Sequence, residues 1–325
     1  MSQKGRVIDA RALKSGGFIR QTEPEFFVAR IHIFGGVIEA DQIAKVAELA
    51  KRYGRGYCHL TFQKSIEVPY VKLEEMESLK ADLEALGLGM ANCGPRVRAV
   101  TNCQGCTINP YGRVDAIRLA KLADERFFGL DCPAKFKISY SGCSIGCANP
   151  QENDLGFHGM VEPQLIPELC NGCTLCVRLC QSRAGAALIM NKDTNLPEYN
   201  GSRCVFDGEC IYCCPTKAWV AKRLGHSVWV GGKHGRFPRW SNRVADFVSD
   251  EDTLEIIEKT VAWYNANARR GERFGTCIDR LGLGKYKKEV LGDRWATAHN
   301  WTRHGDRPKG IKYQVLHTWD RGGAV

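Results

Sequence analysis

The sequence has no hydrophobic run long enough to span a bilayer. Its first residues, MSQKGRVIDARALKSGG, contain no apolar segment of the kind that directs secretion. We therefore expect a cytoplasmic protein without a membrane span. In a reducing compartment, the 16 cysteines of this 325-residue chain are expected to ligate metal rather than to form disulfides. The spacing of the cysteines is then the main guide to function.

The chain also lacks the glycine fingerprint of a flavin-binding or nicotinamide-binding domain. Its glycine-rich segments, GRGYCHL and GLGLGMANCG, supply no G-x-G-x-x-G turn between a strand and a helix. Lysine and arginine exceed aspartate and glutamate by 46 to 36, but the basic residues are dispersed and are not interleaved with aromatic residues as in a nucleic-acid platform. The net charge of +10 therefore favours small anionic ligands over nucleic acid, and any electrons must come from another protein.

A cysteine repeat lies in the middle of the chain. The segment CNGCTLCVRLC has the spacing C-x2-C-x2-C-x3-C, which is typical of a ligand run for an iron–sulfur cubane. A shift of 34 positions places three of these four cysteines on later cysteines and the other on an aspartate. In two-cluster ferredoxins the last cysteine of a run ligates the other cluster. The predicted first set is Cys170, Cys173, Cys176 and Cys214, and the predicted second set is Cys180, Cys204, Asp207 and Cys210.

Asp207 distinguishes the second set from the first. A carboxylate oxygen is a harder ligand than a thiolate and binds iron less firmly. Three outcomes are open: a [3Fe–4S] cluster, a [4Fe–4S] cluster with Asp207 as a ligand, or a [4Fe–4S] cluster completed by Cys213. Loss of this cluster and zinc in place of iron are further alternatives, although two interleaved sets at one fixed offset favour iron–sulfur clusters.

Two further pairs of cysteines precede this repeat. VTNCQGCTINPYG contains Cys103 and Cys106, and SYSGCSIGCANPQENDLG contains Cys143 and Cys147 with C-x3-C spacing. Four thiolates in two pairs can hold a third cluster. The ferredoxin-like segment at 165–217 is a small part of the chain, so the main function is expected to lie elsewhere.

These segments resemble those of the siroheme-dependent sulfite and nitrite reductases. The resemblance is greatest to the ferredoxin-insert subunit of anaerobic and dissimilatory sulfite reductases. It rests on GCSIGCANPQENDLG, CPAKFKISYSGC, FFVARIHIFGG and ERFGTCIDRLGLGKYKKEVL, and it covers roughly 17–295. It implies a siroheme coupled to a [4Fe–4S] cluster, with Cys147 as the bridge between them. The family's C-x5-C pair is replaced by Cys103-x2-Cys106, with Asn109 at the family's second cysteine position, so Cys106 is the expected substitute ligand.

The resemblance also implies cations around the substrate. Sulfite is a small dianion whose six-electron reduction to sulfide consumes protons, and cations can bind it and deliver them. Arg98 matches one family arginine, while Lys135 and Lys137 match a Lys-x-Lys pair that alternation on a strand places on one face. Gln63 stands where the family has a second arginine, which makes the pocket less cationic. The segment HLTFQKSIEVPYV is expected to form a strand pair, so Lys64 can compensate only through a backbone shift, because a one-residue slip in a strand turns the side chain to the other face.

Siroheme carries eight carboxylates and needs further cationic neighbours. The candidate residues for binding it are Arg20, Arg30, His32, Lys233, Arg236 and Arg239. His32, on an alternating strand, is equally well explained as a packed polar side chain. The other cations also have structural alternatives, because a Lys-x-Lys on a strand is commonly a solvated edge and an isolated arginine commonly forms a surface ion pair.

The expected fold is α+β. It comprises a ferredoxin-like half-module, a siroheme and [4Fe–4S] domain of the sulfite-reductase type, and an inserted two-cluster ferredoxin domain. Hydrophobic periodicity predicts the order β-α-β-β-α over 17–92. The expected boundaries are 1–92 for the half-module, 93–164 and 218–295 for the catalytic domain, 165–217 for the insert, and 296–325 for a C-terminal arm.

The predicted function is the reduction of sulfite to sulfide with electrons relayed through the insert. The electrons would come from a donor protein or from a flavin or iron–sulfur subunit, within a homo- or hetero-oligomer. One alternative is a reductase of nitrite or another small oxyanion on the same scaffold. Another is a non-catalytic iron–sulfur electron-transfer subunit, which Gln63 and Asn109 favour.

Overall fold

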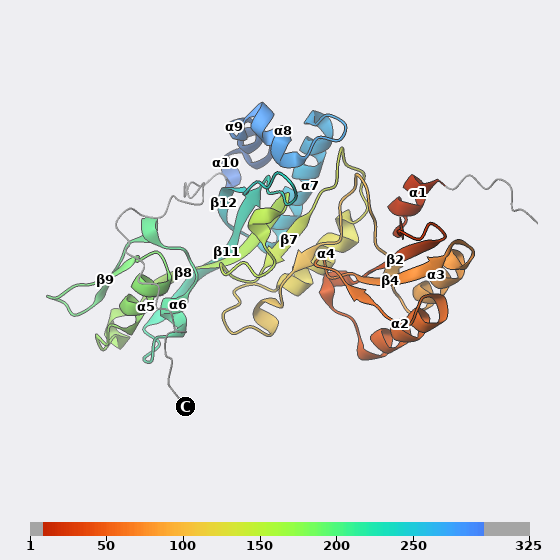
Figure 1. Ribbon diagram of the computed structural model, residues 1–325. Coiled ribbons are helices and arrows are strands. Elements are labelled where there is room, and N and C mark those ends of the chain that lie inside the picture. The colour runs from red at the N-terminus through yellow and green to blue at the C-terminus, as the bar shows by residue number, and fades with distance from the viewer. Residues whose placement is uncertain (1–8, 296–325) are drawn as a thin grey trace, which may run out of the picture.

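The computed structural model describes residues 9–295, which form three hydrophobic cores along the chain (Figure 1). The first core lies in the N-terminal unit, coloured red to orange in Figure 1. The second lies at the central sheet, and the third lies in a small module coloured green. The C-terminal arm predicted at 296–325 lies outside the described residues. Within the described part, no helix is both long enough and apolar enough to traverse a bilayer.

The N-terminal unit is an antiparallel sheet with helices packed against it. The sheet has the order β1-β2-β4-β3, and β5 also pairs with β2. The order β2-α2-β3-β4-α3 is the one predicted for the half-module, and the structure adds β1 before it and β5 after it. The strands are β1 (Phe18–Arg20), β2 (Phe26–His32), β3 (His59–Leu60), β4 (Ile66–Lys72) and β5 (Gly89–Met90). The helices are α1 (Ala10–Ser15), α2 (Ala40–Tyr53) and α3 (Met76–Ala85).

Helix α2 shows how the sequence pattern produces this unit. A capping box between Glu39 and Gln42 satisfies backbone N–H groups at its start. Val46, Ala50 and Tyr53 then fall on one face and are buried against the sheet. Ile43, nearer the start of the helix, is 47% exposed.

The central sheet has the order β12-β11-β8-β7-β6. Strands β6, β7 and β8 are parallel neighbours, whereas β8, β11 and β12 are antiparallel. Helix α4 (Ala116–Phe127) makes the long crossover that a parallel pair requires. The strands are β6 (Thr101–Asn102), β7 (Ile138–Ser141), β8 (Leu155–Leu165), β11 (Trp219–Val230) and β12 (Asn242–Val248). The later helices are α7 (Asp250–Asn267), α8 (Phe274–Leu281), α9 (Leu283–Tyr286) and α10 (Gly292–Trp295), with a π-helical segment at Lys287–Leu291.

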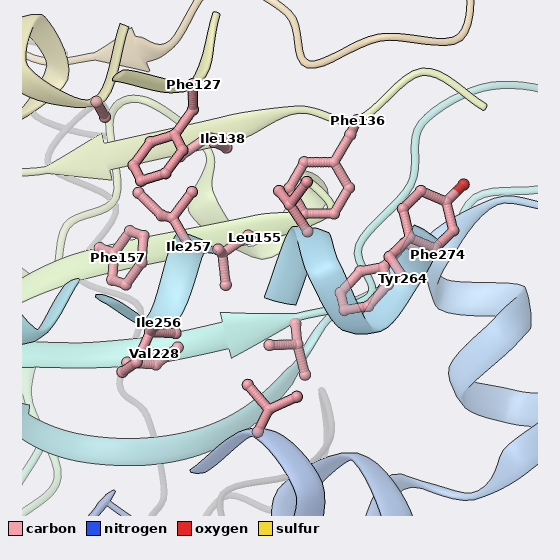
Figure 2. Packing of buried hydrophobic residues seen from close by; sticks show 14 of the residues in the cluster. Phe127, Phe136, Ile138, Leu155, Phe157, Val228, Ile256, Ile257, Tyr264 and Phe274 are labelled. Carbon is pink, nitrogen blue, oxygen red and sulfur yellow. The ribbon is translucent and has the colours of Figure 1, made fainter. Parts of the chain in front are cut away.

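The core beneath this sheet is built from aromatic and branched side chains (Figure 2). Ile257 of α7 faces Leu155 and Phe157 of β8, and Tyr264 lies beside Phe136. Phe274 contacts both Phe136 and Tyr264 in edge-to-face geometry, with ring centroids 5.3 and 5.4 Å apart. This core fixes the segments that precede and follow β7, which carry the candidate site residues.

The cysteine module at 166–218 interrupts the central sheet between two strands that pair with each other. Strands β8 and β11 extend out of the sheet towards the module, and their last pair is Leu165 with Trp219 (Figure 1). The segments WVAKRL and HSVWV both belong to the single strand β11. The module contains α5 (Leu175–Arg183), β9 (Leu188–Met190), β10 (Pro197–Tyr199) and α6 (Glu209–Tyr212). Mixed helices and strands throughout the described residues confirm the α+β class.

Candidate functional site

Two cysteine loops meet at one edge of the central sheet. Cys103 follows β6, and Cys143 lies just beyond β7. Because these strands are parallel neighbours, their carboxyl ends point the same way. Cys103 Sγ accepts hydrogen bonds from the N–H of Gly105 at 3.3 Å and of Gly142 at 3.0 Å. The second of these bonds ties one cysteine loop to the other.

Cys147 belongs to the same group of thiols. Burial raises the pKa of the Cys143 thiol, and the nearby Cys103 and Cys147 raise it further. Metal binding would reverse this effect, because ligand thiols bind as thiolates. Cys106 lies three residues after Cys103 and, like Cys147, is exposed. Asn109 accepts a hydrogen bond from the N–H of Tyr111 at 3.0 Å. The structure thus places Cys103, Cys143 and Cys147 near one another, and Cys106 as the fourth ligand stays a prediction.

The module gathers its cysteines around two separate cavities. Both sets combine residues from the first run with residues from its shifted copy, and these are the eight residues that the repeat assigned. One cavity is lined by Cys170, Cys173, Cys176 and Cys214, and the other by Cys180, Cys204, Asp207 and Cys210. Their role as cluster ligands stays a prediction.

The separation of these side chains bears on the zinc alternative. Within the described residues, no group of three or more histidine, cysteine, aspartate or glutamate side chains is arranged to hold a single metal ion. A lone zinc ion needs its donors within about 2.3 Å of one point. A cubane binds each thiolate at a different iron and suits more widely spaced ligands. The cavities therefore fit an iron–sulfur cluster better than one ion.

Cys213 lies near two cysteines of the first set, Cys176 and Cys214. Burial raises the pKa of Cys213 to about 11, and the neighbouring thiols Cys176 and Cys214 contribute to this rise. Cys213 does not line the cavity of Asp207, whose carboxyl group has its pKa raised by burial. The Cys213 thiol also lies 3.7 Å from the carbonyl oxygen of Cys210 in the second set, so Cys213 as a completing ligand stays a prediction.

Replacing Asp207 with cysteine tests the second set directly. We expect the variant to give a [4Fe–4S] signal from an all-thiolate cluster, because a thiolate holds the fourth iron more firmly than a carboxylate does. Electron paramagnetic resonance of the reduced protein, with iron and sulfide analysis, measures this change. The matched control is Asp193→Cys in an exposed turn of the module. Identical spectra for wild type and Asp207→Cys would contradict a cluster at this set.

A group of cations surrounds the start of β7. The backbone N–H of Arg98 donates to the carbonyl of Phe136 at 2.8 Å, which places Arg98 beside the Lys-x-Lys segment. Phe136 is buried while Lys135 and Lys137 on either side are more exposed, as expected for alternation along an extended segment. Lys137 is half-buried, and its backbone N–H donates to Asp154 Oδ2 at 3.0 Å.

Arg273 completes this group. It forms a two-oxygen ion pair with the buried Asp154, with Nη2–O distances of 2.9 and 2.7 Å. Burial lowers the pKa of Lys137 to about 8, and the charge of Lys135 contributes to this lowering. Burial, Arg273 and Arg98 likewise lower the pKa of Lys135. Four cations thus lie within electrostatic reach of one another, with one carboxylate among them.

Unpaired donors indicate what this cation group can bind. Arg98 is 9% exposed, and its Nε is buried without a partner among the described residues. Arg273 Nε is also buried without a hydrogen-bond partner among the described residues. A buried guanidinium donor without a partner is costly and is satisfied by an anion. The group therefore fits a small oxyanion or a carboxylate of a larger ligand.

The sequence contained no usable signal for Arg273 and Asp154. Both lie inside segments that resemble the reductases, but they are 119 positions apart and neither spacing nor periodicity links them. Only the fold brings α8 to the start of β8. The bidentate pair is thus a product of tertiary structure that sequence reasoning missed.

The region of Gln63 differs from the expectation of a strand. Residues 61–65 form a turn between β3 and β4, in which the N–H of Thr61 donates to Ser65 O and the N–H of Lys64 to Thr61 O. Lys64 has a φ of 63°, and Gln63 is half-buried. The expected strand is therefore wrong at Gln63 and Lys64, and the alternation of faces along a strand does not apply to these two residues.

The Arg239 side chain forms hydrogen bonds that link the loop before β12 to α8 and to the end of β11. Its Nε and Nη2 donate to Asp279 at 2.9 and 2.7 Å, and Nη2 also donates to Asn242. Its Nη1 donates to the carbonyls of Gly231 and Trp240. These bonds use all five N–H groups of the guanidinium. No donor remains for a siroheme carboxylate, so the structure disagrees with this assignment.

The other candidates for siroheme carboxylates fall into two groups. Arg30 pairs with Glu67 at 2.6 Å, and His32 is 1% exposed, with Nε2 3.1 Å from Asp124 Oδ2 and its ring stacked on Phe128. These contacts favour the packing explanation for His32. The remaining three stay available at or near the surface: Arg20, Lys233 and Arg236.

Comparison with known families identifies the scaffold that holds these residues. The model of the nitrite and sulphite reductase 4Fe-4S domain matches residues 93–298. The model of the nitrite/sulfite reductase ferredoxin-like half domain matches residues 19–86. The chain belongs to the nitrite and sulfite reductase family. The predicted resemblance and the predicted half-module are therefore confirmed.

Relatives within this family include several sulfite reductases. The chain is 30% identical over 277 residues to the coenzyme F420-dependent sulfite reductase of Methanocaldococcus jannaschii, covering 85% of this chain and 44% of that protein. It is 24% identical over 306 residues to one subunit of the anaerobic sulfite reductase of Salmonella typhimurium, covering 88% of each. The structure of dissimilatory sulfite reductase I superposes with a TM-score of 0.74 at 16% identity, covering 90% of this chain and 77% of that one. This chain thus spans less than half of the F420-dependent relative, and the solved structure shows a shared fold.

Proposed function

We propose that this protein reduces sulfite to sulfide at a siroheme coupled to a [4Fe–4S] cluster, with electrons relayed through the cysteine module. The observation that carries the proposal is the placement of two functional groups on the same parallel strands. The segments that lead into β6 and β7 carry Arg98, Lys135 and Lys137, and the loops that follow carry Cys103 and Cys143. Membership of the reductase family supports this reading of the two groups.

The residues present fit both cofactors in chemical type. Three gathered thiols suit an iron–sulfur cluster, for which Cys103, Cys143 and Cys147 are the proposed ligands and Cys106 the proposed fourth. The unpaired Nε donors of Arg98 and Arg273 suit an anion. A siroheme bound there would supply the iron centre at which the sulfur atom is reduced. Arg20, Lys233 and Arg236 remain the proposed partners for its carboxylates.

The cations have distinct proposed tasks. Arg98 and Arg273 bind the oxyanion, since guanidinium groups pair well with oxygen pairs and stay charged. Lys137 holds a proton that it can release, because its pKa lies near 8 instead of at the ordinary 10.5. Asp154 fixes the Arg273 guanidinium and the backbone of Lys137. Lys135 adds positive charge at the more exposed side of the group.

Partners are part of the proposal. We propose that a reduced donor protein, or a flavin or iron–sulfur subunit, supplies the electrons. The Salmonella relative is itself one subunit of a reductase. We accordingly propose a homo- or hetero-oligomer in the cytoplasm.

Anaerobic purification followed by an optical spectrum and pigment extraction tests the proposal. We expect siroheme bands, iron in excess of two cubanes, and sulfide formation from sulfite with reduced viologen. Clusters without any tetrapyrrole would instead support an electron-transfer subunit, an alternative that Asn109 at the family's second cysteine position favours.

Nitrite is the second candidate substrate. The matching family models cover nitrite as well as sulfite reductases, and Gln63 in place of an arginine reduces the positive charge available for a dianion. A reductase of the monoanion nitrite needs less positive charge. Ammonia from nitrite, with no sulfide from sulfite, in the same viologen assay would favour this candidate.

A further inference from the structure

Arg113 connects the catalytic cysteine loops with the module. It lies in the loop after Cys106, and its backbone N–H donates to the carbonyl of Gly142 at 2.6 Å. Its side chain crosses to the module, where Nε and Nη2 donate to the backbone carbonyl of Asp207 at 3.0 and 2.9 Å. Gly142 directly precedes Cys143, and Asp207 is the unusual member of the second set. One residue therefore contacts both cysteine-bearing loops.

The module is shaped to accept this arginine. Gly208 has a φ of 76°, and a Cβ added there would lie 2.6 Å from Arg113 Nη2. A glycine is thus needed both for the backbone conformation and for the close approach of the guanidinium. Nearby, the Tyr111 ring packs on the Tyr212 ring with centroids 4.4 Å apart. The loop before Arg113 and helix α6 consequently share a second contact.

The second set lies closer to the catalytic loops than the first set does. A cavity of about 420 Å³ is lined by both Cys143 and Asp207, together with Tyr111, Arg183 and Glu209. The cavity of the first set is lined only by residues of the module and Trp219. The positive charge of Arg113 acts on both the Cys143 thiol and the Asp207 carboxyl group. The shared cavity and the charge of Arg113 thus both place the second set nearer than the first set to the loop that carries Cys143.

We propose that Arg113 is a positioning residue that holds the second set against the Cys143 loop and makes this set the last relay before the catalytic centre. The inference rests on the proposed function and deepens it. In the step concerned, one electron leaves the reduced cluster at the second set and enters the oxidised centre at Cys103, Cys143 and Cys147. The first set receives electrons from the external donor, a low-potential flavin or iron–sulfur protein, and re-reduces the second.

Arg113→Gln tests this inference in the anaerobically purified full-length protein. Hydrogen–deuterium exchange reports on docking at 105–113 and 204–212, and rapid-freeze electron paramagnetic resonance after mixing with dithionite reports the order of cluster reduction. We expect exchange at both segments to rise about tenfold, as for the loss of a charge-assisted hydrogen-bond pair. Reduction of the catalytic cluster is expected to slow about tenfold, while the iron content stays the same. Arg113→Lys keeps the charge without the paired donors and should recover only part of the rate.

Arg178→Gln is the matched control, because it removes an exposed positive charge from helix α5 between two cysteines. It should leave exchange at both segments and the reduction rate as in wild type. Unchanged exchange and rate in Arg113→Gln would overturn the inference, and so would faster exchange with an unchanged rate. Absence of tetrapyrrole or of sulfite turnover would sink the proposed function, yet the exchange and cluster signals would still test Arg113.

Discussion

Cys143→Ser is expected to abolish sulfite reduction and to remove the signal of the siroheme-coupled cluster. Cys143 is buried at the edge where two parallel strands end, and its thiol lies among the other proposed ligands. A serine hydroxyl is a poor ligand for iron in such a cluster. We expect a loss of activity of roughly 10³-fold or more, as when an essential member of a catalytic unit is removed. Steady-state turnover with reduced viologen and electron paramagnetic resonance measure the two effects.

Cys277→Ser provides the control for this prediction. Cys277 is also a buried thiol, but it lies on α8 in the central core and not in a cysteine loop. The same substitution there should leave the cluster signals in place even if it lowers the melting temperature. The signals from the module should survive in both variants, since the module has its own core. Retention of the coupled cluster in Cys143→Ser would contradict the proposed ligand set.

Lys137→Gln is expected to lower kcat/KM for sulfite by about 100-fold, within the range that a positioned proton donor contributes. Lys137 combines partial burial with three cationic neighbours, Lys135, Arg273 and Arg98, which lower its pKa. The protonated form both attracts the dianion and supplies a proton. Lys51→Gln on the exposed side of α2 removes the same charge elsewhere and should have little effect. An equal loss in both variants would contradict a specific role for Lys137.

The pH dependence of activity provides a second test of Lys137. Because its pKa is about 8 in the folded protein, wild-type kcat/KM should fall as the pH rises through about 8 and the lysine loses its proton. Lys137→Arg should lose this alkaline limb, since a guanidinium stays protonated. Ionisation of sulfite affects both proteins equally and cancels in the comparison. An unchanged limb in Lys137→Arg would assign it to another group.

The lowered pKa of Lys137 makes the free energy of unfolding rise with pH over the range in which activity is expected to fall. An unfolded lysine keeps its proton up to its ordinary pKa of 10.5, so the unfolded state binds more protons than the folded state between about pH 8 and 10.5. Lys137 therefore destabilises the fold at neutral pH, and this cost declines as the pH rises through that window.

The cysteine sets could be predicted because their information is local. The ligand spacing within a run and the fixed offset between the two runs are both properties of the sequence, and the structure groups the same residues around two cavities. The half-module could also be predicted from the sequence. The alternation of hydrophobic residues along β2 and their helical periodicity along α2 directly reflect which side chains are buried. Family segments then placed Arg98 and the Lys-x-Lys pair.

The partners of individual arginines could not be predicted in this way. Arg273 meets Asp154, and Arg239 meets Asp279, only after distant segments have packed together. A basic residue in sequence does not reveal whether its donors are already used, as those of Arg239 are. The segment around Gln63 was misread because its composition fits a strand, whereas a hydrogen-bonded turn joins β3 to β4.

The position of the cysteine module has a consequence for how it could be inserted into or removed from this fold. The chain leaves the central sheet after Leu165 and returns at Trp219, its direct partner across β8 and β11. A short hairpin turn could close the same two strands without changing their register. Addition or deletion of the whole cysteine module at this point would therefore leave the sheet, and the residues proposed to bind the oxyanion, in place.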